Sequence, residues 1–434
     1  MIDPFSRLDT LQQGMRATAC STLYFSFSKC LRALLLLLSG ASHRFTQVGP
    51  YERLFAQSEG AAWAHSTSMA RVALWQSLKA LGVKAGDPVL LSPVNIPEML
   101  AVIESLGLKP VYVDFAEHSL FVDPKDLETK ILSSRARVFF LTYVAGQIGD
   151  LETVHSLCRR HEVAFVQDAT QAPGCLYRGK SLTQWADLTF YSTCELKFIH
   201  TYRGGMLCGN SRDLEKRLLP LLGSVQKKSS LSSWLKKWFI DSCAGCALNP
   251  FWFGHFFHVF SSKIFVQDPL RDFRSFDPGK GAHRIFGSDY HLMKEQMPTF
   301  MVYRPSDFEA RLGRLDLRRA PQRIESHKKI SARYQKELQG LNLLPHVSPL
   351  AQSSYWRFPV LTKNAEQTER LRLQMKAQGV ILEKTGLSFL PEDSSMRAAS
   401  LIGNMLFLPC HAGVDETVTA RIIAGLKSFA EARS

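Results

Sequence analysis

The sequence is short of acidic residues, and it lacks the patterns that usually accompany such an excess of positive charge. Its 434 residues include 53 Lys and Arg against 39 Asp and Glu, a net charge of +14. It has no zinc-finger spacing, no aromatic RNA-binding signature and no polybasic tail. These absences argue against nucleic acid as a partner. An anionic membrane surface or a phosphorylated substrate remains as the explanation of the charge.

Regular cysteine spacing is also missing. The nine cysteines are an odd number and are widely scattered, which predicts reduced thiols in a cytosolic protein. The single CxxC motif, Cys243 and Cys246, has no second pair of ligands at a suitable spacing. We therefore expect no metal site, and we interpret the motif as two buried thiols in an apolar segment.

The N-terminal region lacks both a clean signal peptide and an uninterrupted membrane span. Residues 19–40 are strongly apolar and end in five consecutive leucines, but Lys29 and Arg32 interrupt the run and no small-residue cleavage site follows it. A spanning helix needs about 20 mostly apolar residues. We expect residues 1–45 to form an apolar helical segment that lies in the core or on a membrane surface.

From residue 51 onward, apolar strands alternate with helices. We expect strands at 88–91, 110–114, 138–142 and 164–168, and helices at 69–81, 98–106, 125–132 and 151–161. Continuous apolar strands in such an order predict an α/β fold with a mostly parallel sheet covered on both faces. We assign a large domain to residues 46–305 and a small C-terminal α+β domain to residues 306–434. Ligands of such sheets bind at the carboxyl ends of strands, where Asp168 lies.

An aromatic insertion at about residues 225–285 interrupts this regularity. Ten aromatic residues lie between Trp234 and Phe265. Two interpretations remain open. The insertion could supply additional core or a dimer contact, or it could form a membrane-surface element, because Trp and Phe beside Lys pairs are typical of interfacial helices.

Two residues carry the chemical signal. Asp168 ends an apolar strand, and Lys197 follows a second strand about thirty residues later, with Gly204 and Gly205 close behind. Pyridoxal phosphate chemistry requires this pair. The lysine forms a Schiff base with the aldehyde, and the carboxylate keeps the pyridinium nitrogen protonated so that the ring can accept electrons.

Motifs in the same order as in one enzyme family surround this pair. The chain resembles the DegT/DnrJ/EryC1/StrS sugar aminotransferases, a branch of the fold-type I pyridoxal phosphate enzymes, as a divergent member. The matching stretches cover nearly the whole chain after about residue 30, and they read V-G-P-Y-E at 48–52, G-L-K-P-V-Y-V-D at 107–114, D-A-T-Q-A at 168–172, Tyr303-Arg304 and L-P-C-H at 408–411.

The resemblance implies a role for each matched residue. Lys197 would be the Schiff-base lysine and proton shuttle, and Asp168 would pair with the pyridinium nitrogen. Gln171 would lie near the cofactor ring, and Ser192 would donate to the phosphate. Arg304 would lie near the rim of the site. Arg203, which the family's motif does not share, is a further candidate for contact with substrate. The resemblance also implies a homodimer that shares its site.

The family's phosphate loop is altered in this chain. Met69-Ala70-Arg71 stands where the family has Ser-Gly-Thr. Backbone amides at a helix N-terminus, including that of Ala70, can still bind phosphate, and Arg71 can add a bidentate contact. Arg203 stands where the family has a carboxylate.

The leading hypothesis is an aminotransferase that moves an amino group from an amino acid, glutamate being the first candidate, to a keto or aldehyde carbon of a sugar-like acceptor, nucleotide- or lipid-linked. Its expected location is the cytoplasm, with peripheral attachment to the inner face of the membrane as an option. The alternatives are a degenerate, non-catalytic membrane scaffold and an acyl-CoA condensing enzyme of the same fold. Lys197 argues against the sugar dehydratases of the family, in which a histidine replaces the lysine.

Overall fold

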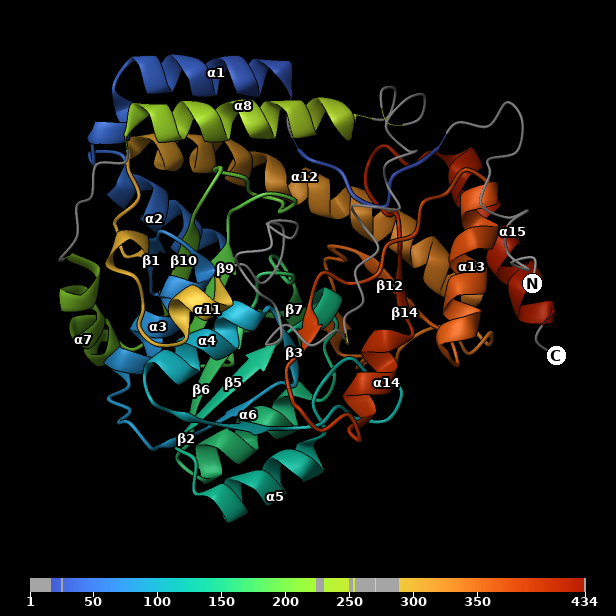
Figure 1. The fold of residues 1–434 in the computed structure, drawn as a ribbon, viewed down its shortest axis with the longest axis horizontal. Coiled ribbons are helices and arrows are strands. Elements are labelled where there is room, and N and C mark those ends of the chain that lie inside the picture. The colour runs from blue at the N-terminus through green and yellow to red at the C-terminus, as the bar shows by residue number, and fades with distance from the viewer. Residues whose placement is uncertain are drawn as a thin grey trace.

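A computed structural model describes residues 17–24, 26–223, 230–249, 253, 270 and 289–432. Its centre is a seven-stranded sheet in the order β1-β10-β9-β6-β5-β2-β4 (Figure 1). The strands are β1 (Trp63–Thr67), β2 (Pro88–Leu91), β4 (Lys109–Tyr112), β5 (Val138–Thr142), β6 (Ala164–Asp168), β9 (Leu188–Ser192) and β10 (Gly205–Gly209).

The sheet is mostly parallel, as the sequence predicted. Strands β4, β2, β5, β6 and β9 pair in parallel. Strand β10 runs antiparallel to both of its neighbours, β9 and β1. The strands predicted at 88–91, 138–142 and 164–168 match residue for residue. The parallel register places the end of β6 beside the end of β5, with Asp168 opposite Thr142.

Helices cover both faces of the sheet, and alternate residues of each strand feed two separate cores. On one face, Val138 and Phe140 pack with α3 (Ala70–Ala80), α4 (Pro97–Ser105), α7 (Arg212–Gly223) and α11 (Tyr290–Met293). On the other, Phe139 and Leu141 pack with α2 (Val48–Ser58), α5 (Pro124–Ser134), α6 (Leu151–Arg160) and the first half of α12 (Asp307–Leu338). This period-two division is what a sheet buried on both faces requires.

The C-terminal residues build a third core. Tyr334 and Leu338, from the end of α12, pack against β12 (Phe358–Leu361), β14 (Met405–Leu408), α13 (Ala365–Ala377) and α15 (Glu416–Glu431). The start of α12 is set by a capping box, in which Ser306 and Glu309 exchange hydrogen bonds with each other's backbone amides. Since α12 contributes to two cores, the proposed domain limits stay a prediction.

Short elements complete the described chain. Strands β7 (Leu176–Tyr177), β8 (Lys180–Ser181) and β11 (Ala351–Gln352) form a small sheet, and β3 (Val94–Asn95) pairs with β13 (Ser388–Phe389). Helix α14 (Arg397–Gly403) precedes β14.

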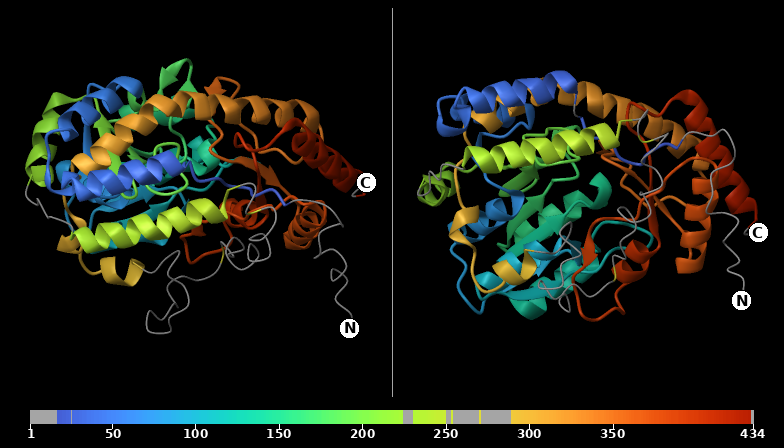
Figure 2. Two further views of the ribbon diagram at one scale, coloured as in Figure 1. Left: turned by 90° about the horizontal axis from the view of Figure 1, so that it is seen from above. Right: turned by 45° about the horizontal axis from the view of Figure 1, so that its top comes forward.

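Two further helices lie beside α12 on the outside of the molecule. Helix α1 (Phe27–Leu38) falls within the expected N-terminal segment, and α8 (Leu231–Ala247) falls within the expected aromatic insertion. Figure 2 shows α1 between α8 and α12. Lys29 of α1 is buried and pairs with Asp316 of α12, with Nζ and Oδ2 2.5 Å apart. No helix among the described residues has the length and apolar character needed to cross a membrane.

The interpretation of the CxxC motif as two buried thiols is wrong. Cys243 and Cys246 are both exposed on α8. The error arose because α8 is apolar around most of its circumference, so that its pattern does not distinguish inner from outer positions. Most of the expected insertion after residue 249 lies outside the described residues.

Candidate active site

The carboxylate of Asp168 is held at the end of β6, beneath the surface. Its side chain is buried, and it accepts hydrogen bonds from the Thr170 amide to Oδ1 (2.9 Å) and from Asn95 Nδ2 to Oδ2 (3.1 Å). Burial raises the pKa of Asp168, while these hydrogen bonds and the charge of Lys197 act to lower it. The group is therefore oriented at both oxygens and lies near a cation.

Lys197 lies in the loop between β9 and β10. Its Nζ is 4.2 Å from the centre of the Trp356 indole ring, and the indole Nε1 donates to the Leu196 carbonyl at 2.5 Å. Burial lowers the pKa of the Lys197 amine, against the opposing charges of Cys194 and Asp168. Leu196 has a φ of 62°, a strained conformation for a leucine. The lowered pKa makes the neutral, nucleophilic form of this amine more accessible than in a lysine exposed to water.

A corner suited to an anion lies where β9, β10 and α3 meet. Ser192, the last residue of β9, pairs with Gly205, the first residue of β10. A Cβ atom on Gly205 would lie 2.7 Å from Thr67 Oγ1 and 2.8 Å from the Ala70 amide nitrogen. The Met69 side chain does not cap the first amides of α3. The Thr67 hydroxyl donates to the Met69 carbonyl at 3.0 Å, and the Ser192 hydroxyl lies 2.9 Å from Cys194 Sγ. Glycine at position 205 lets β10 approach the N-terminus of α3 closely, and backbone amides at a helix N-terminus can bind an anion.

Two of the predicted cofactor ligands have protein partners in the structure. The Arg71 guanidinium lies 3.4 Å from Glu98 Oε1 and 3.0 Å from Asp289 Oδ2. Gln171 is buried, and its Oε1 accepts a hydrogen bond from the Ala145 amide at 2.7 Å. A cofactor contact by either residue stays a prediction.

The two predicted substrate arginines both contact other residues of the protein. The Arg203 guanidinium carbon is 5.3 Å from the centre of the Trp234 ring of α8. Arg304 is 40% exposed, and its Nη2 is 4.0 Å from Glu52 Oε2. Their roles toward substrate also stay predictions.

Three residues that the sequence did not single out belong to this site by geometry. Asn95 donates to both Asp168 and Thr142 Oγ1 (2.7 Å). Trp356 contacts Lys197 and Leu196 as described above. Lys237 of α8 forms ion pairs with Glu195, two residues before Lys197, and with Asp241. Only Asn95 had a sequence signal, as a polar residue just after an apolar strand.

With this geometry in place, the comparisons identify the family. Residues 33–236 and 284–427 match the DegT/DnrJ/EryC1/StrS aminotransferase family. The chain belongs to this family. Among relatives, it is 22% identical over 389 residues to the GDP-perosamine synthase of Caulobacter vibrioides, covering 87% of this chain and 88% of that protein.

One further relative matches about half of the chain in sequence, and a solved structure matches nearly all of it in fold. The chain is 29% identical over 204 residues to the spore coat polysaccharide biosynthesis protein SpsC of Bacillus subtilis, which is 46% of this chain and 52% of that protein. The PLP-form structure of the sugar aminotransferase Spr1654 from Streptococcus pneumoniae superposes with a TM-score of 0.69 at 17% identity, covering 96% of this chain and 99% of that one. The fold-type I architecture is thereby confirmed.

As a member of this family, the protein is an aminotransferase with pyridoxal phosphate as cofactor. The residues present fit that group. Asp168 offers a buried carboxylate to the ring nitrogen, and Lys197 offers an amine of lowered pKa. The N-terminus of α3, which the Met69 side chain does not cap, offers backbone donors to a phosphate, and Ser192 lies at the strand end that faces Gly205.

Proposed function

We propose that this enzyme transfers the amino group of an amino acid, glutamate first among them, to a keto or aldehyde carbon of a sugar-like acceptor that is linked to a nucleotide or a lipid. The observation that carries the proposal is the pair of Asp168 and Lys197, in which a buried carboxylate lies near an amine of lowered pKa. Bound pyridoxal phosphate supplies an aldehyde that takes up the amino group and a ring that accepts electrons.

The chain's own residues would divide the work. Asp168, oriented by Asn95 and the Thr170 amide, would pair with the ring nitrogen and favour its protonated form. Lys197 would bind the aldehyde and, as a free amine, would move a proton. Ser192 and the Ala70 amide would hold the phosphate, and Gln171 would lie near the ring. Arg71 would have to leave or share Glu98 and Asp289 to reach the phosphate.

Charge supports an anionic acceptor. The chain carries a net charge of +14, and the relative from Caulobacter is a GDP-perosamine synthase. A diphosphate-linked sugar would be attracted to such a protein. We place Arg203 and Arg304 at the acceptor, in a site that a second subunit completes. We further propose a cytoplasmic enzyme that attaches to the inner face of the membrane.

The absorption spectrum tests the proposal directly. Full-length protein mixed with pyridoxal phosphate should show the visible band of the lysine-bound cofactor, and glutamate should convert that band while releasing 2-oxoglutarate. Lys197→Ala should abolish the band, whereas Lys180→Ala, an exposed lysine of β8, should leave it unchanged. A wild-type protein without the band would refute the enzymatic proposal.

A second function has one observation in its favour. Arg71 is paired with two carboxylates and does not stand free at the phosphate corner, as would suit a degenerate protein that binds partners without catalysis. Absence of the band would support that alternative. A band that glutamate leaves unchanged, but that an amino acid with acyl-CoA converts, would indicate condensation instead.

A further inference from the structure

Helix α1 has an apolar outer row that nothing in the described structure covers. Phe27, Leu31, Leu35 and Leu38 follow one another at helical spacing and are 85%, 47%, 56% and 64% exposed. The opposite row, Lys29, Ala33 and Leu37, is buried against the protein. The inner row holds the helix against the protein, whereas the outer row points away from the described core.

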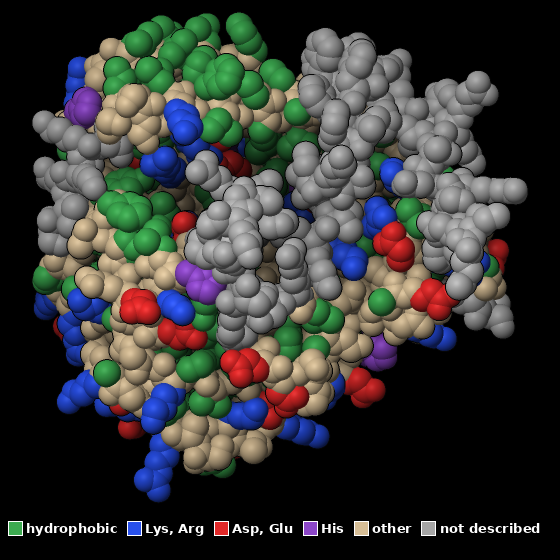
Figure 3. Space-filling model, viewed as in Figure 1, with side chains coloured by type: hydrophobic (Ala, Val, Ile, Leu, Met, Phe, Trp, Pro, Cys, Tyr) green, Lys and Arg blue, Asp and Glu red, His purple; other side chains and the backbone are tan. Residues whose placement is uncertain are grey.

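Helix α8 extends this surface. It lies beside α1, and Trp238 Nε1 donates to the Cys30 carbonyl at 2.9 Å. Its outer positions include Leu231, Phe239 and Ile240, which are 39%, 61% and 50% exposed. Figure 3 shows hydrophobic side chains gathered at the top of the molecule, where Figure 1 places α1 and α8. We call the exposed apolar side chains of these two helices the α1–α8 face.

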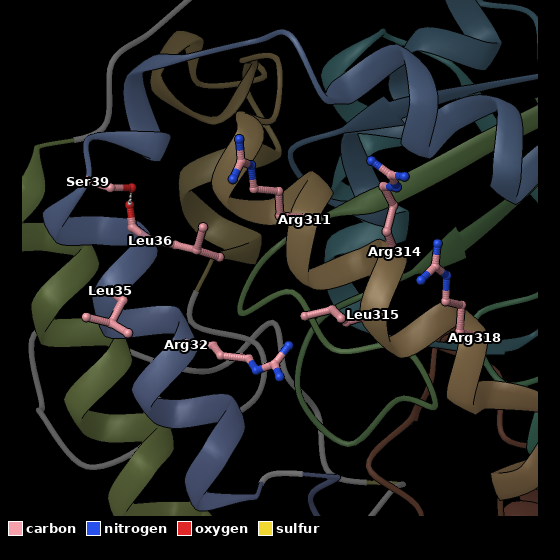
Figure 4. A pocket seen from close by; sticks show the side chains of 8 residues that line it. All are labelled: Arg32, Leu35, Leu36, Ser39, Arg311, Arg314, Leu315 and Arg318. Carbon is pink, nitrogen blue, oxygen red and sulfur yellow. Dashed lines mark hydrogen bonds between the residues drawn. The ribbon is translucent and has the colours of Figure 1, made fainter.

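A groove of about 510 Å³ lies between α1 and α12, along one edge of this face. The surface that lines the groove is mostly apolar. Figure 4 shows that four arginines also line it, one from α1 and three from α12. Arg314 donates to Gln47 Oε1 at 2.8 Å. Within the described ranges, no carboxylate forms an ion pair with the other three. The lining residues are Arg32, Leu35, Leu36, Ser39, Arg311, Arg314, Leu315 and Arg318.

The sequence around the groove has the same sign of charge. No Asp or Glu occurs from Thr10 to Tyr51, whereas four Lys and Arg do. Exposed Lys236 of α8 adds a cation beside Phe239. Apolar side chains bordered by unpaired cations match the boundary between acyl chains and anionic headgroups.

We propose that the α1–α8 face docks on an anionic lipid surface, with Leu31, Leu35, Leu38 and Phe239 in the acyl boundary and the arginine groove holding lipid phosphate. The proposal deepens the peripheral location proposed above and rests on it. It specifies which face of the protein contacts the membrane. In this orientation α1 lies in the plane of the membrane and does not cross it.

Charge favours lipid over a second copy of the chain as the occupant. In a two-fold contact centred on this face, the groove arginines of the two copies would approach one another, and like charges at an interface disfavour association. An anionic surface instead satisfies every cation of the groove. A dimer through this face is therefore treated as an opposing outcome.

Vesicle flotation of the full-length protein with bound cofactor tests the proposal. We expect binding to vesicles of phosphatidylcholine and phosphatidylserine in equal parts, and little binding to phosphatidylcholine alone. Arg311→Glu/Arg318→Glu should weaken binding by well over the roughly 5-fold expected for each cation lost. Leu31→Asn/Leu35→Asn should weaken vesicle binding at high salt as well. Salt screens the attraction between the arginines and the lipid charges, so that the apolar contacts then account for the remaining binding.

Matched controls separate docking from general effects. Lys84→Glu/Lys125→Glu makes the same change of charge at exposed lysines before β2 and in α5, and Leu132→Asn removes an exposed leucine of α5. These variants should float like the wild type. All variants should keep the cofactor band and the conversion by glutamate, so that a failure of the proposed catalysis is seen separately.

Three results would overturn the docking proposal. The wild type could fail to float with the anionic vesicles, or the face variants could bind as tightly as the control variants. Alternatively, Leu31→Asn/Leu35→Asn could change the molar mass in light scattering without changing flotation, which would make this face a contact between copies of the chain.

Discussion

Lys197 Nζ lies 4.2 Å from the centre of the indole ring of Trp356, and the same indole donates its N–H to the carbonyl of Leu196. One side chain thus holds both the reactive amine and the backbone just before it. Arg357, the next residue, also contacts this ring, with its guanidinium carbon 4.5 Å from the ring centre. Trp356 is therefore a positioning residue for the Schiff-base lysine.

Removal of this ring should raise the pKa of Lys197 toward its ordinary value, because burial is the largest cause of the lowered pKa and the indole is part of what keeps water away from the amine. In Trp356→Ala, the pH midpoint for capture of pyridoxal phosphate by the apoenzyme should rise by about one unit. Trp356→Phe keeps a ring and should show a smaller shift. Trp75 makes a similar contact, 4.4 Å from Lys79 Nζ, and Trp75→Phe serves as the control. An unchanged midpoint in Trp356→Ala would contradict the role.

Asp168→Asn should preserve the fold and impair catalysis. Asparagine cannot hold a proton on the ring nitrogen, and we expect kcat to fall about 10²- to 10⁴-fold, the range of a lost acid–base partner. Asn95→Ala removes only one hydrogen bond to the carboxylate, so its loss should be smaller and should lie in kcat more than in KM. Steady-state kinetics with glutamate measures both. Equal losses in the two variants would show that Asn95 acts on something other than Asp168.

The sequence predicted most of the sheet and the central pair, for identifiable physical reasons. Strands such as Val138–Thr142 are nearly continuous apolar runs, a pattern typical of a strand buried on both faces. Asp168 ends β6, and Lys197 follows β9, which is the neighbour of β6 in the sheet, so local pattern and topology agree.

The rest depends on contacts that are remote in the chain. Asn95 meets Asp168 across 73 positions, and Trp356 meets Leu196 across 160. No periodicity or motif encodes such pairs. The antiparallel strand β10 also escaped prediction, since glycines at both of its ends leave a run of only three apolar residues. The exposure of Cys243 and Cys246 was misjudged because an apolar helix at a docking surface has the composition of a buried one.

Gly205→Ala should weaken cofactor binding without a large effect on the apo fold. The new Cβ would lie 2.8 Å from the Ala70 nitrogen and 2.9 Å from the Met69 carbonyl carbon, which are backbone atoms that cannot rotate away. The N-terminus of α3 must then shift from the phosphate corner, and we expect the Kd for pyridoxal phosphate to rise at least about 10-fold, as for the loss of a charge-assisted hydrogen bond. Titration of the visible band measures Kd. Gly49→Ala is the control, since a Cβ there meets only the flexible end of Arg53 at 3.5 Å.

Glu59 should make the stability of the protein depend on pH near neutrality. Burial raises the pKa of this carboxyl from 4.5 to about 7, even though the Tyr191 hydroxyl donates to it at 2.9 Å. The folded state binds more protons than the unfolded state between these values. The contribution of Glu59 to the free energy of unfolding is therefore fully present below pH 4.5, and it is lost as the pH rises through about 7.

Glu59→Gln should remove that dependence. Relative to the wild type, the variant should gain about 3 kcal/mol of unfolding free energy between pH 4.5 and about pH 8. Urea unfolding of the apoprotein across this range measures the difference. Burial also raises the pKa of Glu309 to about 7. This residue is present in both proteins, so its contribution cancels in the difference between them. Parallel pH profiles for wild type and variant would show that Glu59 ionises at its ordinary pKa.

Lys237 connects the surface helix α8 to the catalytic loop. It pairs with Glu195 and, at 2.9 Å, with Asp241, whose buried carboxylate lies 3.3 Å from His200 Nε2. Glu195 and His200 flank Lys197 on either side, so α8 holds the loop at two points. The tie to the loop runs through Glu195, whose side chain is 37% exposed, and an ion pair that water reaches contributes at most about 1 kcal/mol. Loss of this tie in Lys237→Met should therefore raise the Kd for pyridoxal phosphate by no more than about 5-fold. Lys237→Arg should restore it. Lys236→Met, a change at the exposed neighbouring lysine, should have no effect on Kd. If Lys236→Met matches Lys237→Met, the effect comes from the general charge of α8 and not from its tie to the loop.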